Sequence, residues 1–389
     1  MSIQDRLNEN VRGLRPSLLW QFFAMAMDTP NVISLSVGEP DFPTPWHISE
    51  EGIYAIERER TYYPPSLGFA QLRSGIAAYY ERRFGAEGYT GDNVMVTVGA
   101  SEGIDLACRS FLQKGDECII LDPGYVAYEP SVILTGATPV YLKLEEKDGF
   151  KVRAENLRKV LNEKTKMIIL NYPSNPTGGV MTREDYEEIA PLLKQYNVII
   201  VADEIYLELV YGQKPFSIAC IEELRDQLII VSGFSKAWSM TGWRLGYMLA
   251  DPELILTMNN IHQYSTVGPA TPAQFAAIEA VSPKSDRDID THVQAFESRR
   301  NYLTAQLNRM GLHTPLPEGA FYVFANITST GLSSYDFCVR LLQEQAICVI
   351  PGTAFGASGE GFVRISYAYS LQELKTACGR IEQFLESLK

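Results

Sequence analysis

Residues 232–247, SGFSKAWSMTGWRLGY, place one lysine, Lys236, eight positions before Arg244 in a stretch rich in turn-forming residues. The apolar run before the lysine, residues 228–231, predicts a buried strand, and residues 244–250 predict the next strand. Lys236 then lies just past the carboxyl end of a strand, where open α/β sheets bind their ligands. The segment therefore predicts a ligand site in an α/β protein.

A lysine and an arginine in this arrangement suit one kind of ligand. A lysine amine forms imines with carbonyl groups such as that of pyridoxal 5'-phosphate (PLP), and a guanidinium holds a phosphate through paired hydrogen bonds. One short segment then supplies both the covalent and the ionic anchor of one cofactor. A surface lysine and a salt-bridged arginine explain the same spacing equally well.

An acidic residue ends a second apolar run, because residues 198–202 read VIIVA and precede Asp203. A carboxylate at the end of a buried strand is costly without a partner, and the pyridine nitrogen of PLP needs such a carboxylate to stay protonated. Tyr206, three residues on, suits a phenol donor to the 3'-oxygen of the ring. Alternatively, Asp203 caps the next helix and Tyr206 packs in the protein core.

A third apolar run, residues 167–170, leads into NYPSNPTGG, residues 171–179. The Asn-Pro pair before two glycines predicts a turn with a restricted backbone and a cis peptide bond between Asn175 and Pro176. Such a turn at the end of a strand aims the Asn175 amide at a ligand. Taken alone, the motif fits any loop.

Several motifs, in order and at compatible spacing, together resemble those of the PLP-dependent aminotransferases of fold type I, class I/II. The motifs are SLSVGEPDFPTP, LDPGYVAY, NYPSNPTGG, ADEIY, GFSK with MTGWRLGY, GAFYVF, and PGTAFG with VRISYA. They extend from about residue 33 to the C-terminus and are most similar to the subgroup of prokaryotic aspartate and aromatic aminotransferases. The resemblance implies PLP as cofactor and amino acids and 2-oxoacids as substrates.

The resemblance assigns roles to the residues around the lysine. Lys236 becomes the residue that forms the Schiff base and moves the proton between substrate and cofactor. Asp203 becomes the partner of the ring nitrogen, while Tyr206 and Asn175 become donors to the 3'-oxygen. Tyr125, in DPGYVAY, takes the place of the aromatic residue that stacks on the ring. Many relatives have tryptophan there, so we expect a smaller stacking surface.

The cofactor phosphate is expected where the strand-like run of residues 94–98 gives way to a helix. The residues that the resemblance assigns to it are Gly99, Ala100, Ser101, Ser235 and Arg244. Exposed amides at a helix N-terminus attract phosphate, so the turn also suits this role on physical grounds. Family members often have serine where this chain has Gly233, so we expect one hydroxyl contact to be missing or to be replaced by Ser232.

Three more residues complete the implied site. Arg364, in FVRISYA, matches the arginine that binds the substrate α-carboxylate, a bidentate task for which lysine is poorly suited. A buried ion pair within the protein is the alternative for Arg364. Gly38, in the GEPDF motif, lies beside the substrate. Tyr63 matches the tyrosine that reaches the phosphate of a neighbouring subunit, so we expect a homodimer with shared active sites.

Composition bounds the possible partners and the compartment. The 389 residues, 46% of them hydrophobic, are enough for two cores. The formal net charge of −13 disfavours nucleic acid and anionic membranes as partners, and no apolar stretch approaches the roughly 20 residues of a membrane-spanning helix. No signal peptide is recognisable at the N-terminus, so we expect a cytoplasmic protein.

Neither cysteine nor histidine spacing predicts a metal site. The six cysteines form no CxxC pair and are expected to be reduced and mostly buried. The four histidines, His47, His262, His292 and His313, are isolated in the sequence, and we expect them to serve packing or to lie at the surface.

Alternating strand and helix patterns predict a mostly parallel sheet covered by helices on both faces, followed by a smaller α/β domain. The predicted strands of the sheet are residues 94–98, 118–121, 167–170, 198–202, 228–231 and 244–250. Those of the smaller domain are 320–324, 347–350 and 362–366, with helices at 335–344 and 371–388. We expect residues 1–45 to form an N-terminal arm and part of the small domain, 46–290 the large PLP-binding domain, and 291–389 the small C-terminal domain.

The resemblance implies transfer of an amino group from an L-amino acid to a 2-oxoacid such as 2-oxoglutarate. Some aspartate-specific relatives place a lysine at the position of Ser101, and Glu102 would repel a second carboxylate if it faced the site. We therefore expect aromatic and other uncharged donors to be favoured over aspartate. An aspartate aminotransferase and a C–S lyase of the cystathionine β-lyase kind are the alternatives, because one fold hosts several chemistries. A transcriptional regulator with an aminotransferase-like domain is disfavoured, because about thirty residues before the first motif are too few for a winged helix.

Overall fold

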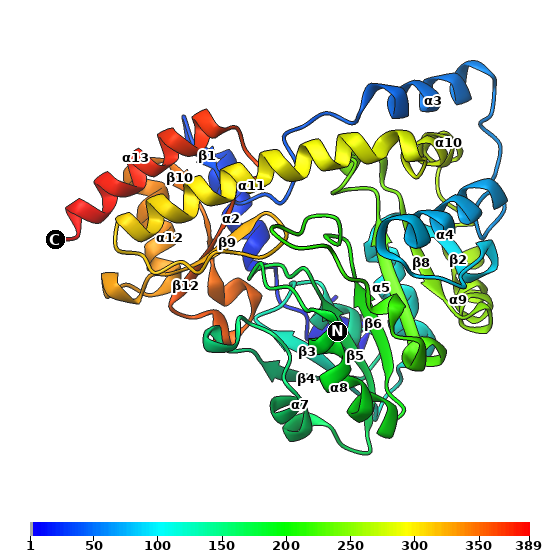
Figure 1. Ribbon diagram of the computed structural model, residues 1–389. Helices are drawn as coiled ribbons and strands as arrows, with labels where there is room; N and C mark the ends of the chain where they lie inside the picture. Colours follow the sequence, from blue (N-terminus) through cyan, green and yellow to red (C-terminus); the bar gives the residue numbers. More distant parts are fainter. Residues whose placement is uncertain (1–2) are drawn as a thin grey trace.

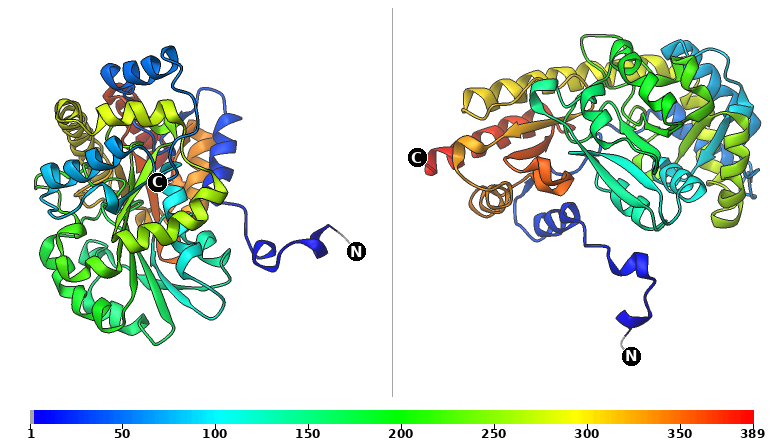
Figure 2. Two further views of the ribbon diagram at one scale, coloured as in Figure 1. Left: turned by 90° about the vertical axis from the view of Figure 1, so that its right-hand side faces the viewer. Right: turned by 90° about the horizontal axis from the view of Figure 1, so that it is seen from below.

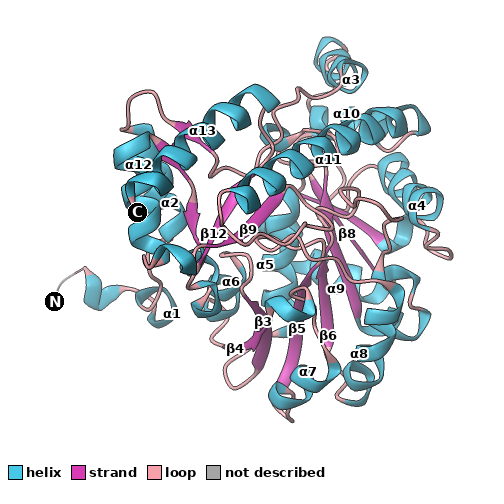
Figure 3. Ribbon diagram, turned by 60° about the vertical axis from the view of Figure 1, so that its left-hand side comes forward, coloured by secondary structure: helices cyan, strands magenta, loops and turns pink. Residues whose placement is uncertain are grey.

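A seven-stranded sheet lies at the centre of the larger part of the molecule (Figures 1 and 3). The computed structural model describes residues 3–389. The strands, in the spatial order β2-β8-β7-β6-β5-β3-β4, are β2 (Val94–Thr97), β8 (Gly246–Ala250), β7 (Leu228–Gly233), β6 (Ile199–Asp203), β5 (Thr165–Asn171), β3 (Glu117–Asp122) and β4 (Thr138–Lys143). Of these seven, β8 alone runs in the direction opposite to the other six strands. The predicted mostly parallel sheet is confirmed.

Helices cover both faces of this sheet because its strands bury side chains on both sides. Along β5, Ile168 and Leu170 pack into one core, and Met167 and Ile169 pack into the other. The first core also receives side chains from α4 (Ala70–Phe84), α7 (Ala154–Val160) and α8 (Arg183–Gln195), and the second from α5 (Gly99–Phe111), α6 (Tyr128–Ile133) and α9 (Pro252–Ser265). Continuous apolar strands of this kind are typical of a parallel sheet between two helical layers.

A second, smaller sheet belongs to the C-terminal part of the chain. It has the order β11-β12-β9 and is antiparallel. Its strands are β9 (Tyr322–Asn326), β11 (Ile350–Pro351) and β12 (Phe362–Ser366), and α12 (Ser334–Gln345) and α13 (Leu371–Ser387) pack beside it. A strand from the N-terminal arm, β1 (Ile33–Ser34), pairs with β10 (Ile347–Cys348). The assignment of residues 1–45 to an arm and part of the small domain stays a prediction.

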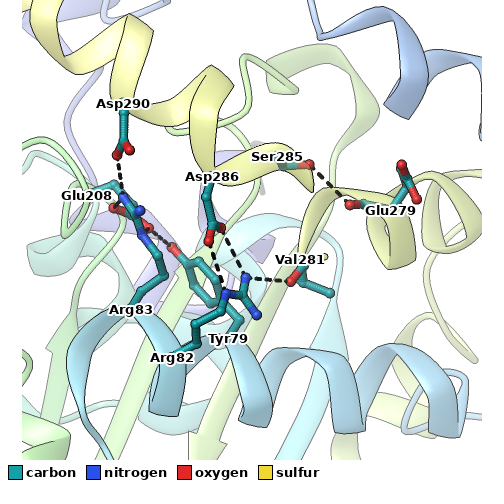
Figure 4. Close-up of polar contacts among 9 residues, drawn as sticks. All are labelled: Tyr79, Arg82, Arg83, Glu208, Glu279, Val281, Ser285, Asp286 and Asp290. Carbon is teal, nitrogen blue, oxygen red and sulfur yellow. Dashed lines mark hydrogen bonds and ion pairs between the residues drawn. The ribbon is translucent and has the colours of Figure 1, made fainter. Parts of the chain in front are cut away.

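Long helix α11 (Asp286–Arg309) runs across the molecule from one part to the other (Figure 1). Its first turns are held to α4 by two arginines (Figure 4). Arg82 grips Asp286 through two hydrogen bonds of 3.1 Å, and Arg83 contacts Asp290 at 2.9 Å and buried Glu208 at 2.8 and 3.0 Å. A buried carboxylate that loses such a partner costs about 3–5 kcal/mol, so these contacts fix where α11 begins. The predicted domain division near residue 290 falls inside this helix and stays a prediction.

The remaining helices lie at the edges of the fold. The N-terminal arm carries α1 (Glu9–Arg12) and α2 (Leu18–Met27), and its first residues extend away from the body (Figure 2). Helix α3 (Trp46–Glu57) packs along α10 (Thr271–Ala280). Within residues 3–389, no helix is both long and apolar enough to cross a membrane.

Two strand predictions need correction. The predicted strand at residues 244–250 begins too early, because Arg244 has a φ of +53° and ends a 3₁₀ turn, Thr241–Trp243, before β8 starts. Strand β4 was not predicted, because it lies at the sheet edge and alternates exposed and half-buried residues instead of forming an apolar run. The difference matters for function, because the Arg244 side chain leaves a turn in another direction than it would leave a strand.

Candidate active site

A cavity of about 490 Å³ lies at the carboxyl ends of the parallel strands. The large sheet, helix α2 and the small sheet all contribute to its walls, and Asn171 and Asp203, which end β5 and β6, line it. The predicted site residues that line it are Gly38, Ala100, Ser101, Tyr125, Asn175, Asp203, Tyr206, Ser235, Lys236, Arg244 and Arg364. The ends of parallel strands are where α/β sheets hold ligands, so this cavity is the candidate active site.

Lys236 lies in the turn that follows β7, as predicted, and its amine is inside the cavity. Its Nζ donates a hydrogen bond of 2.6 Å to the carbonyl oxygen of Gly38. Burial lowers the pKa of Lys236 to about 8. The negative charge of Glu39 opposes this shift, and the positive charges of Arg364 and Arg244 add to it. An amine that loses its proton near neutral pH is suited to act as a nucleophile and as a base.

The carboxyl group of Asp203 is fully buried at the end of β6. It accepts hydrogen bonds from the hydroxyl of Tyr128 at 2.7 Å and from the backbone N–H of Ile205 at 3.1 Å. Burial raises the pKa of Asp203 to about 6. Within the described part of the chain, no basic side chain forms an ion pair with this carboxylate, so a cationic group of a ligand is a suitable partner.

Tyr128 and Tyr322 support the site but were not predicted. Tyr128 begins α6 three residues after Tyr125, and the two rings meet edge to face at 5.4 Å. The hydroxyls of Tyr206 and Tyr322 lie 2.8 Å apart. Both missed residues stand in quoted motifs, LDPGYVAY and GAFYVF, but their contacts join segments that are far apart in the sequence.

The turn after β5 has the predicted form. The peptide bond between Asn175 and Pro176 is cis, and the backbone N–H of Asn175 donates to the Asn171 side chain at 2.9 Å. The Asn175 side-chain oxygen accepts a hydrogen bond of 2.9 Å from Arg364. Asn175 therefore lines the cavity, and its side-chain carbonyl oxygen orients the guanidinium of Arg364.

Arg364 is a buried cation without an acidic partner. Its guanidinium lies over the rings of Tyr322 and Phe355 at 4.4 and 4.7 Å and donates to Asn175 and to the carbonyl oxygen of Ser36. Its Nε has no hydrogen-bond partner, and no carboxylate of residues 3–389 forms an ion pair with it. The alternative of an internal ion pair is therefore wrong. An unpaired buried guanidinium is suited to bind a carboxylate from a ligand.

Backbone amides, an arginine and a serine lie close together at the junction of β2 and α5. Helix α5 begins at Gly99, and Ala100 and Ser101 form its exposed first turn at the cavity. The Arg244 guanidinium lies against this turn so closely that a Cβ at Gly99, where φ is +71°, would come within 2.8 Å of it. Ser235 lines the same end of the cavity. Helix amides and an arginine together form an anion site.

Ser232 does not replace the hydroxyl absent at Gly233, so that part of the prediction is wrong. Ser232 points to the opposite side of β7, where its hydroxyl donates to the carbonyl oxygen of Glu204 at 3.2 Å. A Cβ at Gly233 would lie 3.0 Å from the backbone of Leu245 and Gly246. Close approach of β8 therefore explains why position 233 has no side chain.

Two further predicted residues lie outside the cavity. Glu102 turns away from it and binds His262 and Thr266, so its charge does not face a substrate as the sequence had allowed. Tyr63 is 88% exposed beside Tyr62, which is 82% exposed. The role predicted for Tyr63 needs a second chain and stays a prediction.

Helix α2 supplies a wall of the cavity that the sequence did not predict. Leu19, Trp20 and Phe23 line the cavity from this helix, and the rings of Trp20 and Phe23 meet edge to face at 5.5 Å. Trp20 is 64% exposed, so this wall lies at the cavity mouth. The described residues contain no group of three or more His, Cys, Asp or Glu side chains arranged for a metal.

Known proteins of one family match this chain along almost its whole length. The family model "Aminotransferase class I and II" matches residues 30–381. The aromatic-amino-acid aminotransferase 2 of Thermococcus litoralis and the aspartate aminotransferase of Pyrococcus abyssi are each 38% identical over 391 residues, which is 100% of both chains. A crystal structure of an aromatic aminotransferase from Pyrococcus horikoshii is 38% identical, covers 94% of this chain and 99% of its own, and has a TM-score of 0.89.

Proposed function

Because the chain belongs to the class I and II aminotransferase family and is an aminotransferase, we propose that it works with PLP in the cavity around Lys236. The observation that carries this proposal is the set of unpaired charges in one cavity. Buried Asp203 has no cation, buried Arg364 has no anion, and Lys236 has a lowered pKa. These groups match a pyridinium nitrogen, a substrate carboxylate and a carbonyl carbon, in that order.

The residues that would hold PLP fit its separate groups. Asp203, oriented by Tyr128, would meet the ring nitrogen, and Tyr206 with Asn175 would meet the 3'-oxygen. Tyr125, which lines the cavity, would stack on the ring. The amides of Ala100 and Ser101, with Ser235 and Arg244, would receive the phosphate. PLP, when bound, supplies an electron-accepting ring that stabilises negative charge at the substrate Cα.

The chain's own residues then bind and position the substrate and move a proton. Arg364 binds the α-carboxylate through paired hydrogen bonds and is itself held by Asn175. The lack of a side chain at Gly38 lets the Tyr322 hydroxyl lie close to the backbone, because any side chain at this position would clash with that hydroxyl. The Lys236 amine, with its pKa near 8, would take the proton from the substrate Cα. Helix α2 and the small sheet line the cavity in which this transfer would take place.

Charge and shape in the cavity favour an uncharged donor. Among its described lining residues, Lys236, Arg244 and Arg364 are the three basic side chains, and all three are assigned above. The described lining of the cavity therefore offers no fourth cation for a distal carboxylate. The α2 wall of Leu19, Trp20 and Phe23 instead offers an apolar surface. We infer that aromatic and other uncharged L-amino acids are the preferred donors and 2-oxoglutarate an acceptor, in a cytoplasmic enzyme.

We expect kcat/KM to rank phenylalanine and tyrosine above alanine, and alanine above aspartate, because this ratio reports differential binding of the transition state. The measurement compares the four donors with 2-oxoglutarate as the common acceptor. Phe23→Ala should reduce the advantage of phenylalanine over alanine by roughly tenfold, about 1.4 kcal/mol for one lost aromatic contact. Aspartate ahead by more than about tenfold would overturn the preference and leave the cofactor assignment intact.

A panel assay tests the reaction type. Purified yellow enzyme is mixed with single amino acids, and the loss of the yellow absorption band is recorded together with the oxoacid formed. Transamination releases the matching oxoacid in an amount equal to the enzyme sites. Release of pyruvate, ammonia and a thiol from cystathionine in many turnovers would instead indicate the C–S lyase alternative, which the relatives do not favour.

Exposed tyrosines support the proposal of a homodimer with shared active sites. Tyr62, Tyr63 and Tyr264 are all more than four-fifths exposed, at 82%, 88% and 88%. We define these three residues as the tyrosine patch. Such a group of large exposed rings is unusual on a monomer, and in the family a tyrosine at position 63 reaches the cofactor phosphate of the second copy.

Tyr63→Phe should raise the dissociation constant for PLP by about tenfold, because a hydroxyl bound to a charged phosphate contributes about 1.5–3 kcal/mol. The measurement is a fluorescence titration of cofactor-free protein with PLP. Tyr62→Phe is the matched control, since it removes a hydroxyl from the adjacent exposed ring and should leave the constant unchanged. A monomer that is fully active in sedimentation experiments would contradict the shared site.

A further inference from the structure

A buried histidine that the reaction does not use lies on α9, two residues before Tyr264 of the tyrosine patch. His262, on α9, is fully buried, and both of its ring nitrogens have partners. Nδ1 lies 2.9 Å from a carboxylate oxygen of Glu102, and Nε2 lies 2.9 Å from the carbonyl oxygen of Ser66. Because a backbone carbonyl only accepts hydrogen bonds, Nε2 must carry a proton.

The second ring nitrogen, Nδ1, lies against the carboxylate of Glu102. Glu102 also accepts hydrogen bonds from the backbone N–H of Val98 and the hydroxyl of Thr266. Although burial acts in the opposite direction, the bonds from His262 and Val98 lower the pKa of Glu102. His262 and Glu102 therefore form a buried hydrogen-bonded pair.

The two partners of His262 belong to two functional segments. Glu102 directly follows the turn of residues 99–101 that receives the cofactor phosphate, and it also holds Val98 at the start of that turn. Ser66 belongs to the loop of residues 62–66, which carries Tyr62 and Tyr63. Tyr264 follows His262 by two residues on α9. One ring thus joins the phosphate turn to the loop and the helix that carry the three members of the tyrosine patch.

We propose that His262 is a positioning residue that couples binding of the cofactor phosphate to assembly with a second copy of the chain. This inference rests on the proposed function, namely PLP binding and a homodimer. The pair of hydrogen bonds fixes the loop of residues 62–66 relative to the phosphate turn, so order in one segment favours order in the other. Coupling of this kind is reciprocal, because each binding event must change the free energy of the other equally.

The test measures the dissociation constant of the dimer with and without saturating PLP, by mass photometry. In the wild type, PLP should tighten the dimer by roughly tenfold or more, within the usual range of coupling. In His262→Gln, the factor by which PLP lowers the dissociation constant of the dimer should fall below about threefold. Glu102→Gln should show the same loss, and the double variant should lose no more, because both residues act through one pair.

His47→Gln is the matched control. His47 also contacts two acceptors, Glu279 and Asp288, each at 3.0 Å, but touches neither the phosphate turn nor the loop of residues 62–66. Its removal should leave the coupling factor at the wild-type value. An equal loss of coupling in His47→Gln would show that general destabilisation is responsible and would overturn the proposal.

Nuclear magnetic resonance of ¹⁵N-histidine-labelled wild type provides a readout that does not depend on folding of a variant. We expect the Nε2 of His262 to carry a proton, as its contact with the Ser66 carbonyl oxygen requires, and a ring protonated on Nδ1 alone would overturn the proposal. An unchanged coupling factor in both His262→Gln and Glu102→Gln would overturn it as well. If the wild type neither binds PLP nor forms dimers, the proposed function itself is what fails.

Discussion

Lys236→Ala is expected to abolish turnover, with a loss in kcat of at least about 10⁴-fold. One amine both anchors the cofactor and moves the proton, and it is the one lysine among the described residues that line the cavity. The measurement is kcat with phenylalanine and 2-oxoglutarate. PLP should still bind to the variant, because the phosphate contacts of Arg244 and the α5 turn are unchanged.

Lys166→Ala is a suitable control, since this lysine is exposed on β5 and does not line the cavity. It should retain wild-type turnover. Reduction with borohydride should attach the cofactor to the peptide that contains Lys236. Near-normal activity in Lys236→Ala, or attachment to a different lysine, would disprove the assignment.

Asp203→Asn is expected to lower kcat by about 10²–10³-fold, or about 2.7–4 kcal/mol, as when one electrostatic partner is removed from an active site. The amide retains the shape and still accepts from Tyr128, but it does not keep the ring nitrogen protonated. The measurement is single-turnover kinetics at saturating PLP. A loss smaller than about tenfold would indicate that another group protonates the ring.

The same substitution should make the cofactor-free protein more stable. The folded-state pKa of Asp203, about 6, lies above the usual value of 3.8. The stability that this group contributes is therefore fully present below the unfolded pKa and is lost as pH rises through 6. At pH 7, Asp203→Asn should raise the free energy of unfolding by about 1–3 kcal/mol. Urea denaturation at pH 7 and pH 4 checks this, because the gain should nearly vanish at the lower pH.

Sequence patterns predicted the centre of the site well, because the chemistry lies directly after apolar runs. β6 ends at Asp203, and the predicted Asn175 and Lys236 follow a few residues after the ends of β5 and β7. Parallel strands bring their carboxyl ends to one edge, so three local patterns were enough to place these groups together. The edge strand β4 has no continuous apolar run, and its alternation of half-buried and exposed residues gave a weaker signal.

The error at Ser232 was avoidable. Side chains alternate between the two faces of a strand, so Ser232 must point with Leu228 and Ile230, and Gly233 with Ile229 and Val231. Two adjacent residues of β7 therefore do not substitute for one another. By contrast, the contacts of Tyr128 with Asp203 and of Tyr206 with Tyr322 join residues 75 and 116 positions apart. No local pattern predicts such pairs, because tertiary packing creates them.

The wall formed by helix α2 has a consequence for comparing enzymes of this kind. The family match begins at residue 30, whereas Leu19, Trp20 and Phe23 come before it. Relatives can therefore share the whole matched region and its reaction and still differ in the surface that meets the substrate side chain. Grouping homologues by residues 18–27 should sort them by preferred donor better than overall identity does. A library of variants confined to this one helix is also the most economical place to evolve a new selectivity.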